Sequence, residues 1–515
     1  MLGLAVALAA CAGSEPLPAD PTGRLFARGL AEIGELYITP VSTRKLAFAG
    51  AAQLSMLDRN VSVSETPGPE SGTEIVLNYA GREIAADASP RGQDPNAWGE
   101  WLGRLITEAK RTSPPLAKLP DDKIEEAVFD GITGALDRFS RYAPPDAARD
   151  QRAMRDGFGG IGVTLDLGTE GFLVAQVTPG TPADLAGIRP GDRIVAIDGK
   201  PTAGHDEDEV VHQLRGPISS PVRVSLERPN GSRRELVLHR TLIVVPTVTT
   251  SRDGAIAILR VASFNQNTTQ QIVESLSQLR GTPGGLRGVV LDLRGDPGGL
   301  LDQAVSLADV FIAKGPIVAT VGRHPASRQL FEASGDSLAP HLPIVVLIDG
   351  GSASAAEIVA AALQDAGRAV VVGSASYGKG TVQTVLRLPN DGELTLTWAQ
   401  LVTPSGYLLN QHGVVPTLCT SDLGNDESSI QIAVQRAGAT APVSPLSYRP
   451  RKELDEPDWS RLRRACPGRR GDHPIDLIVA KRLLNDPILY SAATHIMTLA
   501  GPPASGPVAA APVTP

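Results

Sequence analysis

The spacing of hydrophobic residues changes twice along the chain, and each pattern predicts a different kind of domain. Near the N-terminus, residues 45–59 (KLAFAGAAQLSMLDR) and 123–138 (KIEEAVFDGITGALDR) carry apolar side chains three and four positions apart. That spacing predicts amphipathic helices. The Gly- and Pro-containing insert between them holds one strand-like piece, residues 74–79 (EIVLNY). We therefore expect residues 22–150 to form a mainly helical N-terminal domain.

From Phe158 onward the pattern becomes one of short alternating apolar runs separated by tight turns, which predicts half-buried strands. One helical stretch, residues 206–214, interrupts them. The strand-like runs are residues 161–167, 172–177, 192–199, 222–228 and 234–240. Together they predict a small β-rich module over residues 156–245.

From residue 255 onward, buried-type strands such as residues 343–349 (PIVVLID) alternate with helical stretches such as residues 355–367. This alternation predicts an α/β core over residues 246–420, so the fold class is multidomain. Residues 421–500 are polar and irregular with a couple of helical stretches, and we expect a C-terminal extension there. The Pro/Ala-rich residues 501–515 are predicted to be disordered.

Composition narrows the class of function. The 515 residues are 42% hydrophobic and 20% charged, which is enough to build packed cores. The net charge of -8 arises from interspersed acids and bases and argues against a nucleic-acid partner, which would select a concentrated basic face. The eight histidines are scattered and no CxxC or HExxH occurs, so we expect neither a metal site nor a cofactor.

The N-terminus predicts export. MLGLAVALAAC has the length of a signal-peptide apolar region, and its last four residues, Leu8 to Cys11, resemble the lipobox of bacterial lipoproteins. Residues 1–21 are therefore expected to be a leader and spacer, with Cys11 acylated as the anchor to the cell envelope. The alternative is an ordinary secretion signal that contains an incidental cysteine. In an oxidising compartment Cys419 and Cys466 could form a disulfide, although the sequence does not place them together.

Lys379 lies in VVGSASYGKGTVQ (residues 371–383), which is compatible with three kinds of chemistry. A phosphate-binding loop would need Ser or Thr after the lysine to hold magnesium, and Gly380 stands there. A pair formed by Ser376 and Lys379 would need a helix to bring both side chains to one face, and the flanking glycines disfavour one. In the third kind of chemistry, Lys379 would act on a serine that lies earlier in the chain.

Ser352 and Ser354 both lie where the strand at residues 343–349 turns into a helix. A serine at such a junction is held at the edge of the sheet, and the N–H of Ala355 could bind an oxyanion there. The alternative for Ser354 is plain helix capping, with Glu357 completing a capping box. A Ser-His-Asp arrangement would have to use the remote His412.

Two motifs, GGSASAAEIVAAALQDAGRAVVVG (residues 350–373) and YGKGTVQ (residues 377–383), resemble those of the C-terminal processing proteases, also called tail-specific proteases. The resemblance covers residues 120–418. It implies α/β layers like those of crotonases and ClpP, with Ser354 as nucleophile, Lys379 as general base and Gln383 orienting the lysine amine. The supporting polar residues that it implies are Glu357, Asp365 and Ser376.

Lysine can act as a base only when neutral, and burial with no carboxylate near it would lower its pKa towards neutrality. No acid occurs within ten residues of Lys379 on either side. A second source of oxyanion-binding amides is LRGDPGG, which resembles the family motif LRNNPGG and implies roles for Gly298 and Gly299. Its Gly-Asp pair departs from that motif.

Phe158, Gly159, Gly160, Ile161 and Gly162 resemble the carboxylate-binding loop of PDZ domains, and residues 177–199 resemble the middle of such a domain. PDZ domains add an extended C-terminal tail to a sheet edge and bind its carboxylate on backbone amides. The resemblance thus implies protein substrates with apolar C-termini. The alternative is a PDZ-like fold that regulates or binds no peptide.

We expect an exported, periplasmic or envelope-bound serine endopeptidase, with membrane contact only through its N-terminus. The family resemblance would also allow an adaptor protein and a homo-oligomer. Two alternatives are a catalytically silent peptide-binding scaffold and an acyl-CoA enzyme that shares the glycine-rich oxyanion site. Neither predicts Ser354, Lys379 and Gln383 beside a PDZ-like module. The physiological substrate and the effect of that module on activity stay open.

Overall fold

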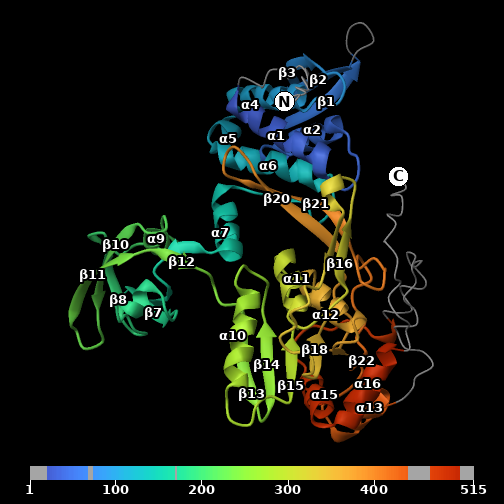
Figure 1. Ribbon diagram of the computed structural model, residues 1–515. Helices are drawn as coiled ribbons and strands as arrows, with labels where there is room; N and C mark the ends of the chain where they lie inside the picture. The colour runs from blue at the N-terminus through green and yellow to red at the C-terminus, as the bar shows by residue number, and fades with distance from the viewer. Residues whose placement is uncertain (1–19, 68–72, 169–170, 439–463, 499–515) are drawn as a thin grey trace, which may run out of the picture.

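The computed structural model describes residues 20–67, 73–168, 171–438 and 464–498 (Figure 1). The leader with Cys11 and the tail at residues 501–515 lie outside the described residues. Within the described ranges, no helix has both the length and the apolar character needed to cross a membrane.

The N-terminal region is mainly helical, as expected. Asp20 begins its first helix by accepting a hydrogen bond from Gly23 N–H, and Asp94 caps another in the same way. Trp98 and Trp101 pack edge to face at the centre of its core. The main helices are α1 (Pro21–Leu36), α2 (Thr43–Ala52), α4 (Pro95–Thr112) and α6 (Asp121–Gly134), with short α3 (Leu54–Leu57) and α5 (Pro114–Ala117).

The insert between these helices differs from the expectation of a single strand. It forms a three-stranded antiparallel sheet of β1 (Val61–Pro67), β2 (Thr73–Tyr79) and β3 (Arg82–Ala88). Only β2 has three consecutive buried residues, whereas its two neighbours are largely exposed. The outer strands therefore lack the apolar pattern that identified the central one.

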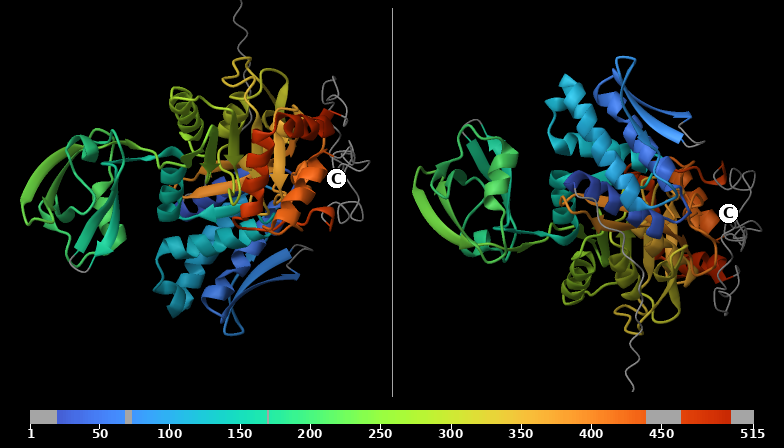
Figure 2. Two further views of the ribbon diagram at one scale, coloured as in Figure 1. Left: turned by 90° about the horizontal axis from the view of Figure 1, so that it is seen from below. Right: turned by 90° about the horizontal axis from the view of Figure 1, so that it is seen from above.

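The β-rich module stands apart from the rest of the chain in all three views (Figures 1 and 2). It is attached through helix α7 (Pro145–Asp156) and a two-stranded ribbon of β5 (Phe158–Gly160) and β12 (Thr241–Ile243). Its main sheet has the order β11-β10-β8-β7-β6. The elements are β6 (Val163–Gly168), β7 (Gly171–Val177), α8 (Pro182–Leu185), β8 (Arg193–Ile197), β9 (Lys200–Pro201), α9 (Glu207–Leu214), β10 (Pro221–Glu227) and β11 (Arg233–His239).

The α/β core is built on a six-stranded sheet with the order β13-β14-β15-β18-β19-β22, parallel except at β13. Its central strands are buried on both faces, as parallel sheets require. In β18, Ile344 and Val346 face one hydrophobic cluster, and Val345 faces the other. The strands are β13 (Val248–Asp253), β14 (Ile256–Val261), β15 (Gly288–Asp292), β18 (Ile344–Ile348), β19 (Val370–Gly373) and β22 (Leu418–Cys419).

Helices cover both faces of this sheet. One face packs on α10 (Thr268–Arg280), α11 (Leu301–Asp309) and α12 (Ala355–Asp365). The other packs on α13 (Glu427–Gly438), α15 (Pro474–Asn485) and α16 (Pro487–Thr498). The C-terminal extension, expected to be irregular with a couple of helical stretches, is therefore a structural layer of the core where it is described.

A second sheet, in the order β17-β16-β21-β20, connects the core to the N-terminal helices. Leu388, Leu394 and Leu396, at and beside the β20–β21 turn, are buried in the N-terminal core. The buried carboxylate of Glu393 also binds two arginines of α7. The strands are β16 (Pro316–Val321), β17 (Gln329–Glu332), β20 (Thr381–Arg387) and β21 (Glu393–Val402), with β4 (Arg141–Ala143) paired to β21.

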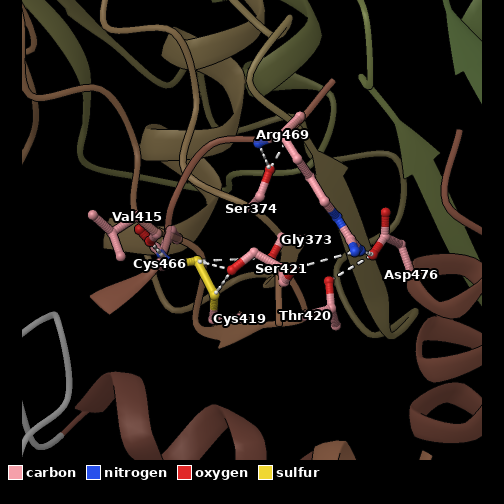
Figure 3. Close-up of a disulfide and its surroundings, with 10 residues drawn as sticks. Gly373, Ser374, Val415, Cys419, Thr420, Ser421, Cys466, Arg469 and Asp476 are labelled. Carbon is pink, nitrogen blue, oxygen red and sulfur yellow. Dashed lines mark hydrogen bonds and ion pairs between the residues drawn. A yellow bond between two sulfur atoms is a disulfide. The ribbon is translucent and has the colours of Figure 1, made fainter. Parts of the chain in front are cut away.

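A disulfide joins Cys419 of β22 to Cys466. Figure 3 shows Arg469, from the segment that follows Cys466, between Ser374 and Asp476. Its backbone N–H donates to Ser374 Oγ at 3.1 Å, and its guanidinium contacts Asp476 at 3.2 Å. The disulfide that the sequence allowed thus fixes the C-terminal segment to β22, and Arg469 fixes it to the loop after β19.

Candidate active site

Three loops meet at the carboxyl edge of the parallel sheet. They follow β15, β18 and β19 and comprise residues 293–299, 349–354 and 374–380. Because neighbouring parallel strands end at the same edge, helix α12 and strand β19 bring the segments of Ser354 and Lys379 together. One helix and one strand separate the two residues along the chain.

Ser354 lies in a strained turn immediately before α12. Its φ of 54° is in the left-handed region, which a side chain other than glycine adopts only at a cost of about 1–3 kcal/mol. Its neighbour Ser352 is fully buried, and its hydroxyl donates to Leu293 O at 2.8 Å. Ser352 therefore fixes the turn, and Ser354 is the partly exposed serine at the edge.

Glu357 holds the Ser354 and Lys379 loops together. One carboxylate oxygen, Oε2, accepts from Ser354 N–H at 2.7 Å and from Lys379 N–H at 2.9 Å. The other accepts from Gly378 N–H at 2.7 Å and from the Ser376 hydroxyl. Full burial raises the pKa of Glu357, while these hydrogen bonds act in the opposite direction. The residue is thus more than a helix cap, because it also binds a loop 22 residues away.

Lys379 lies in an environment that favours its neutral form. Burial lowers the pKa of its amine, and the positive charge of Arg141 lowers it further, against weaker opposing effects of Glu357 and Asp137. The amine lies 5.4 Å from the centroid of the Phe139 ring. Among the residues that the structure describes, no carboxylate lies within ion-pair distance of it.

The N-terminal residues Phe139 and Arg141 were missed by sequence reasoning. They precede Lys379 by more than 230 residues and carry no motif of their own. Pairing of β4 with β21 brings their segment to the core. Only the structure could reveal this proximity.

Of the three backbone N–H groups expected to bind the oxyanion, two are not used in hydrogen bonds within the described residues. Within the described parts of the chain, Gly299 N–H and Ala355 N–H have no hydrogen-bond acceptor. Gly298 differs from the expectation, because its N–H already donates to Asp296 Oδ1 at 2.8 Å. A Cβ atom at Gly298 would lie 2.8 Å from Ser354 Cβ and 2.9 Å from Ala355 N, so only glycine allows the two loops to approach.

The remaining expected site residues have other contacts. Gln383 Nε2 donates to Thr381 Oγ1 at 2.9 Å and to Thr397 Oγ1 at 3.3 Å, and no hydrogen bond joins it to Lys379 within the described chain. Asp365 accepts from Ser405 N–H at 3.0 Å at the far end of α12, about 16 Å along the helix from Ser354.

Ser376 and His412 have structural partners. The Ser376 hydroxyl donates to Glu357 and accepts from Val414 N–H at 2.7 Å. His412 Nδ1 lies 2.6 Å from Leu408 O. Residues 374–380 are not helical, so the chain gives no helix that would place Ser376 and Lys379 on one face.

A cavity of about 770 Å³ lies beside the lysine loop. Ser376, Tyr377 and Gly378 line one wall, and Phe139 and Arg470 line others. The guanidinium of Arg470 lies 5.9 Å from the centroid of the Tyr377 ring. The N-terminal region, the core and the C-terminal extension thus all contribute to its wall.

In the β-rich module, the Phe158–Gly162 segment is held by close backbone contacts. Gly159 O accepts from Gly216 N–H at 2.9 Å, and Ile161 O accepts from Ala183 N–H at 2.9 Å. Gly160 is paired with β12. A Cβ at Gly162, whose φ is +85°, would lie 2.2 Å from Thr181 Oγ1. Beside this loop, β6 is an edge strand of the main sheet, open to a further strand.

The described residues contain no group of three or more His, Cys, Asp or Glu side chains that could hold a metal ion. The buried acids of the core have protein partners instead. Arg294, for example, contacts Asp292 at 2.6 Å and Asp476 at 3.4 Å.

Two sequence models of known families match parts of this chain. The sequence model of peptidase family S41 matches residues 255–419, and that of the PDZ domain matches residues 173–228. The carboxy-terminal-processing protease of Bartonella bacilliformis is 39% identical over 65% of this chain and 78% of its own length. The chain belongs to the carboxy-terminal processing protease family. The expected family and multidomain fold are thereby confirmed.

Other relatives give the same result. The carboxy-terminal processing protease CtpA of Bacillus subtilis is 32% identical, over 67% of this chain and 74% of its own length. A solved photosystem II D1 C-terminal processing protease is 30% identical and covers 60% of this chain and 87% of that chain, with a TM-score of 0.34. By its sequence matches to peptidase family S41, to the PDZ domain and to the two bacterial proteases, this protein is a serine protease with a PDZ domain.

Proposed function

We propose that this protease cleaves protein substrates through an acyl-enzyme formed on Ser354, with Lys379 as the general base. The observation that carries the proposal is the shared Glu357 oxygen, which binds the backbone amides of both residues. It fixes the serine and lysine loops to one another at the edge of the sheet. A lysine with a lowered pKa and no acidic partner can accept the serine proton.

The reaction then proceeds in two balanced halves. Ser354 Oγ attacks the peptide carbonyl carbon while its proton moves to the neutral amine of Lys379. Gly299 N–H and Ala355 N–H donate to the oxyanion, and the lysine returns the proton to the departing amine. A water molecule, deprotonated by the same lysine, attacks the ester and releases the acyl product with Ser354 restored.

Substrate recognition is proposed for the PDZ domain. Its edge strand β6 would pair with an extended C-terminal tail, and the loop at residues 158–162 would bind the terminal carboxylate. The preferred tail would end in an apolar residue. We propose no cofactor and no nucleic-acid partner, and an adaptor protein and a homo-oligomer remain compatible with the family.

We also propose that the protease acts outside the cytoplasm, anchored to the envelope through Cys11. The apolar leader and its lipobox-like end support this. The Cys419–Cys466 disulfide supports it as well, because such bonds persist in oxidising compartments. Labelling with a radioactive fatty acid, abolished by Cys11→Ser, would test the anchor.

The dyad is tested with the full chain and a loosely folded protein substrate with an apolar C-terminal tail. Ser354→Ala and Lys379→Ala should each lower kcat/KM by at least about 10³-fold, because each removes a covalent or proton-transfer step. Ser334→Ala and Lys314→Ala are the matched controls, since both residues are exposed and distant in sequence. They should retain wild-type activity.

The pH profile is the second measurement. Since the neutral lysine is the active form, kcat/KM should rise with pH as the amine loses its proton, below the pH range of an ordinary lysine. Wild-type protein that binds the tail but never cleaves it would instead identify a peptide-binding scaffold. Full activity of Lys379→Ala would show that Lys379 is not the general base.

A further inference from the structure

Asp296 is a buried carboxyl group that the proposed mechanism does not use. Its side chain is fully buried in the loop after β15. Oδ1 accepts from Gly298 N–H at 2.8 Å, whereas Oδ2 has no hydrogen-bond partner among the described residues. The backbone O of the same residue accepts from Ala353 N–H at 2.9 Å, next to Ser354. Asp296 therefore links the oxyanion loop, residues 293–299, to the turn that carries Ser354.

The charged groups on the surrounding elements leave Asp296 without a counter-ion. Arg294, in the same loop, is directed to its own acidic partners. Asp349, on the turn after β18, accepts from Gly295 N–H at 2.8 Å and from three further backbone amides. Glu357 on α12 accepts a hydrogen bond from the backbone N–H of Lys379, so its carboxylate is directed to the lysine loop. Among the described residues, none of these groups lies within hydrogen-bond or ion-pair distance of the Asp296 carboxyl.

A carboxylate with one unpaired oxygen and no counter-ion is strongly disfavoured in a water-free interior, and the neutral acid replaces it. Burial raises the pKa of Asp296 to about 8, and the hydrogen bond from Gly298 opposes this only in part. At neutral pH the group is therefore mostly an uncharged acceptor for Gly298 N–H. Above that range it becomes an anion.

We propose that Asp296 is a positioning residue that holds the oxyanion loop as a neutral acid, and that its ionisation suppresses acyl-enzyme formation. Gly298, which its carboxyl binds, is so close to the nucleophile that a Cβ there would lie 2.9 Å from Ala355 N. A negative charge at Asp296 would oppose the negative charge that develops on the substrate oxygen, in a site of low dielectric. The activity of the protease therefore has an alkaline limit set by this one group. This inference rests on the proposed acylation of Ser354.

The test compares full-length wild type, Asp296→Asn and Asp302→Asn in the tail-bearing substrate assay from pH 6 to 10. Asparagine keeps an acceptor for Gly298 N–H but cannot ionise. Deprotonation of Lys379 raises activity in all three proteins alike. Between pH 7.5 and 9.5, ionisation of Asp296 should lower kcat/KM of the wild type about 20-fold relative to Asp296→Asn. The exposed Asp302, six residues further along the chain, is the matched control and should behave as wild type.

A second readout does not depend on activity. The unfolded-state pKa of an aspartate is about 3.9, so the folded protein loses stability as pH rises from there to about 8 and no further above it. The melting temperature of the wild type should fall relative to that of Asp296→Asn across this window. If the melting temperatures of the two proteins depend on pH in the same way, Asp296 is not a neutral acid in the folded protein.

The outcomes separate this inference from the proposed dyad. If Asp296→Asn keeps the same alkaline decline as wild type, the inference is wrong while the dyad stands. If kcat/KM of the wild type does not decline relative to that of Asp296→Asn, the inference is also wrong. If no protein cleaves any substrate but the melting difference is found, the dyad fails and only the protonation of Asp296 is supported.

Discussion

Two helices of this protease begin with the same local motif and use it differently. In the PDZ domain, α9 starts with a capping box of Asp206 and Glu209. Glu209 is 55% exposed, and it binds its own cap and His205 four residues earlier. In the core, Glu357 takes the same third position in α12, is 0% exposed and binds a second loop. A short sequence motif thus specifies a helix start, while tertiary contacts decide whether it also organises a site.

The difference in burial between the two glutamates matches the proposed role of each region. Acyl transfer needs the serine, lysine and oxyanion donors held to within fractions of an ångström, which buried and fully bonded groups provide. Peptide recognition by strand addition needs an open edge, which β6 offers. The protease therefore combines a closed region for chemistry with an open region for binding.

Truncating the two glutamates should give the largest contrast. Glu357→Ala would leave several buried donors without an acceptor, at about 1–3 kcal/mol each, and should lower activity by at least about 10²-fold. Glu209→Ala should cost under about 0.5 kcal/mol and leave peptide cleavage unchanged. Thermal unfolding and kcat/KM measure both. Similar losses in the two variants would contradict the comparison.

Removing the disulfide should have the next largest effect. The bond closes a sequence separation of 47 residues, which corresponds to about 4 kcal/mol of loop-closure stabilisation. Cys419→Ser combined with Cys466→Ser should lower the unfolding midpoint of the core and leave the transition of the PDZ domain in place. Denaturant unfolding, followed separately for the two regions, measures this. An unchanged unfolding midpoint of the core would show that the C-terminal helices pack on the sheet without the disulfide.

A substitution in the carboxylate-binding loop should have the smallest effect, confined to recognition. Gly162→Ala would bring a Cβ to 2.2 Å from Thr181 Oγ1, so the loop must shift. We expect KM for a tail-bearing substrate to rise about 10-fold with kcat little changed, a loss of about 1.4 kcal/mol of binding. Gly204→Ala is the matched control, because Gly204 also has a positive φ but faces open space. Equal effects would exclude the loop from tail binding.

The sequence predicted those features that depend on local pattern and on parallel-sheet geometry. The strand, turn and helix around Ser354 follow from the apolar run at 343–349 and the alanine-rich stretch after it. The convergence of Ser354 and Lys379 follows from parallel strands ending at one edge. The helices of the N-terminal region follow from their three- and four-residue periods.

Other features depend on contacts that no local pattern encodes. Ser352 and Ser354 could not be separated, because their difference is burial and a backbone strain that appear only in the folded turn. Phe139 reaches Lys379 through the pairing of β4 with β21. Gln383 was expected at the lysine amine, yet two threonine hydroxyls accept its hydrogen bonds. The packing of the C-terminal helices on the sheet was not predicted, because their apolar faces lie among many polar residues.

The outer helical layer also determines when the protein can fold during synthesis. Strand β22 ends at Cys419, but its disulfide partner and the helices α15 and α16, which cover the outer face of the sheet, follow only after residue 463. Chains fold from the N-terminus as they emerge. The PDZ domain, whose core comes from residues 161–238, can therefore form early, whereas the N-terminal core waits for Leu388, Leu394 and Leu396 and the α/β core waits for the segment after residue 463. The PDZ domain is thus complete before the α/β core that carries Ser354 and Lys379.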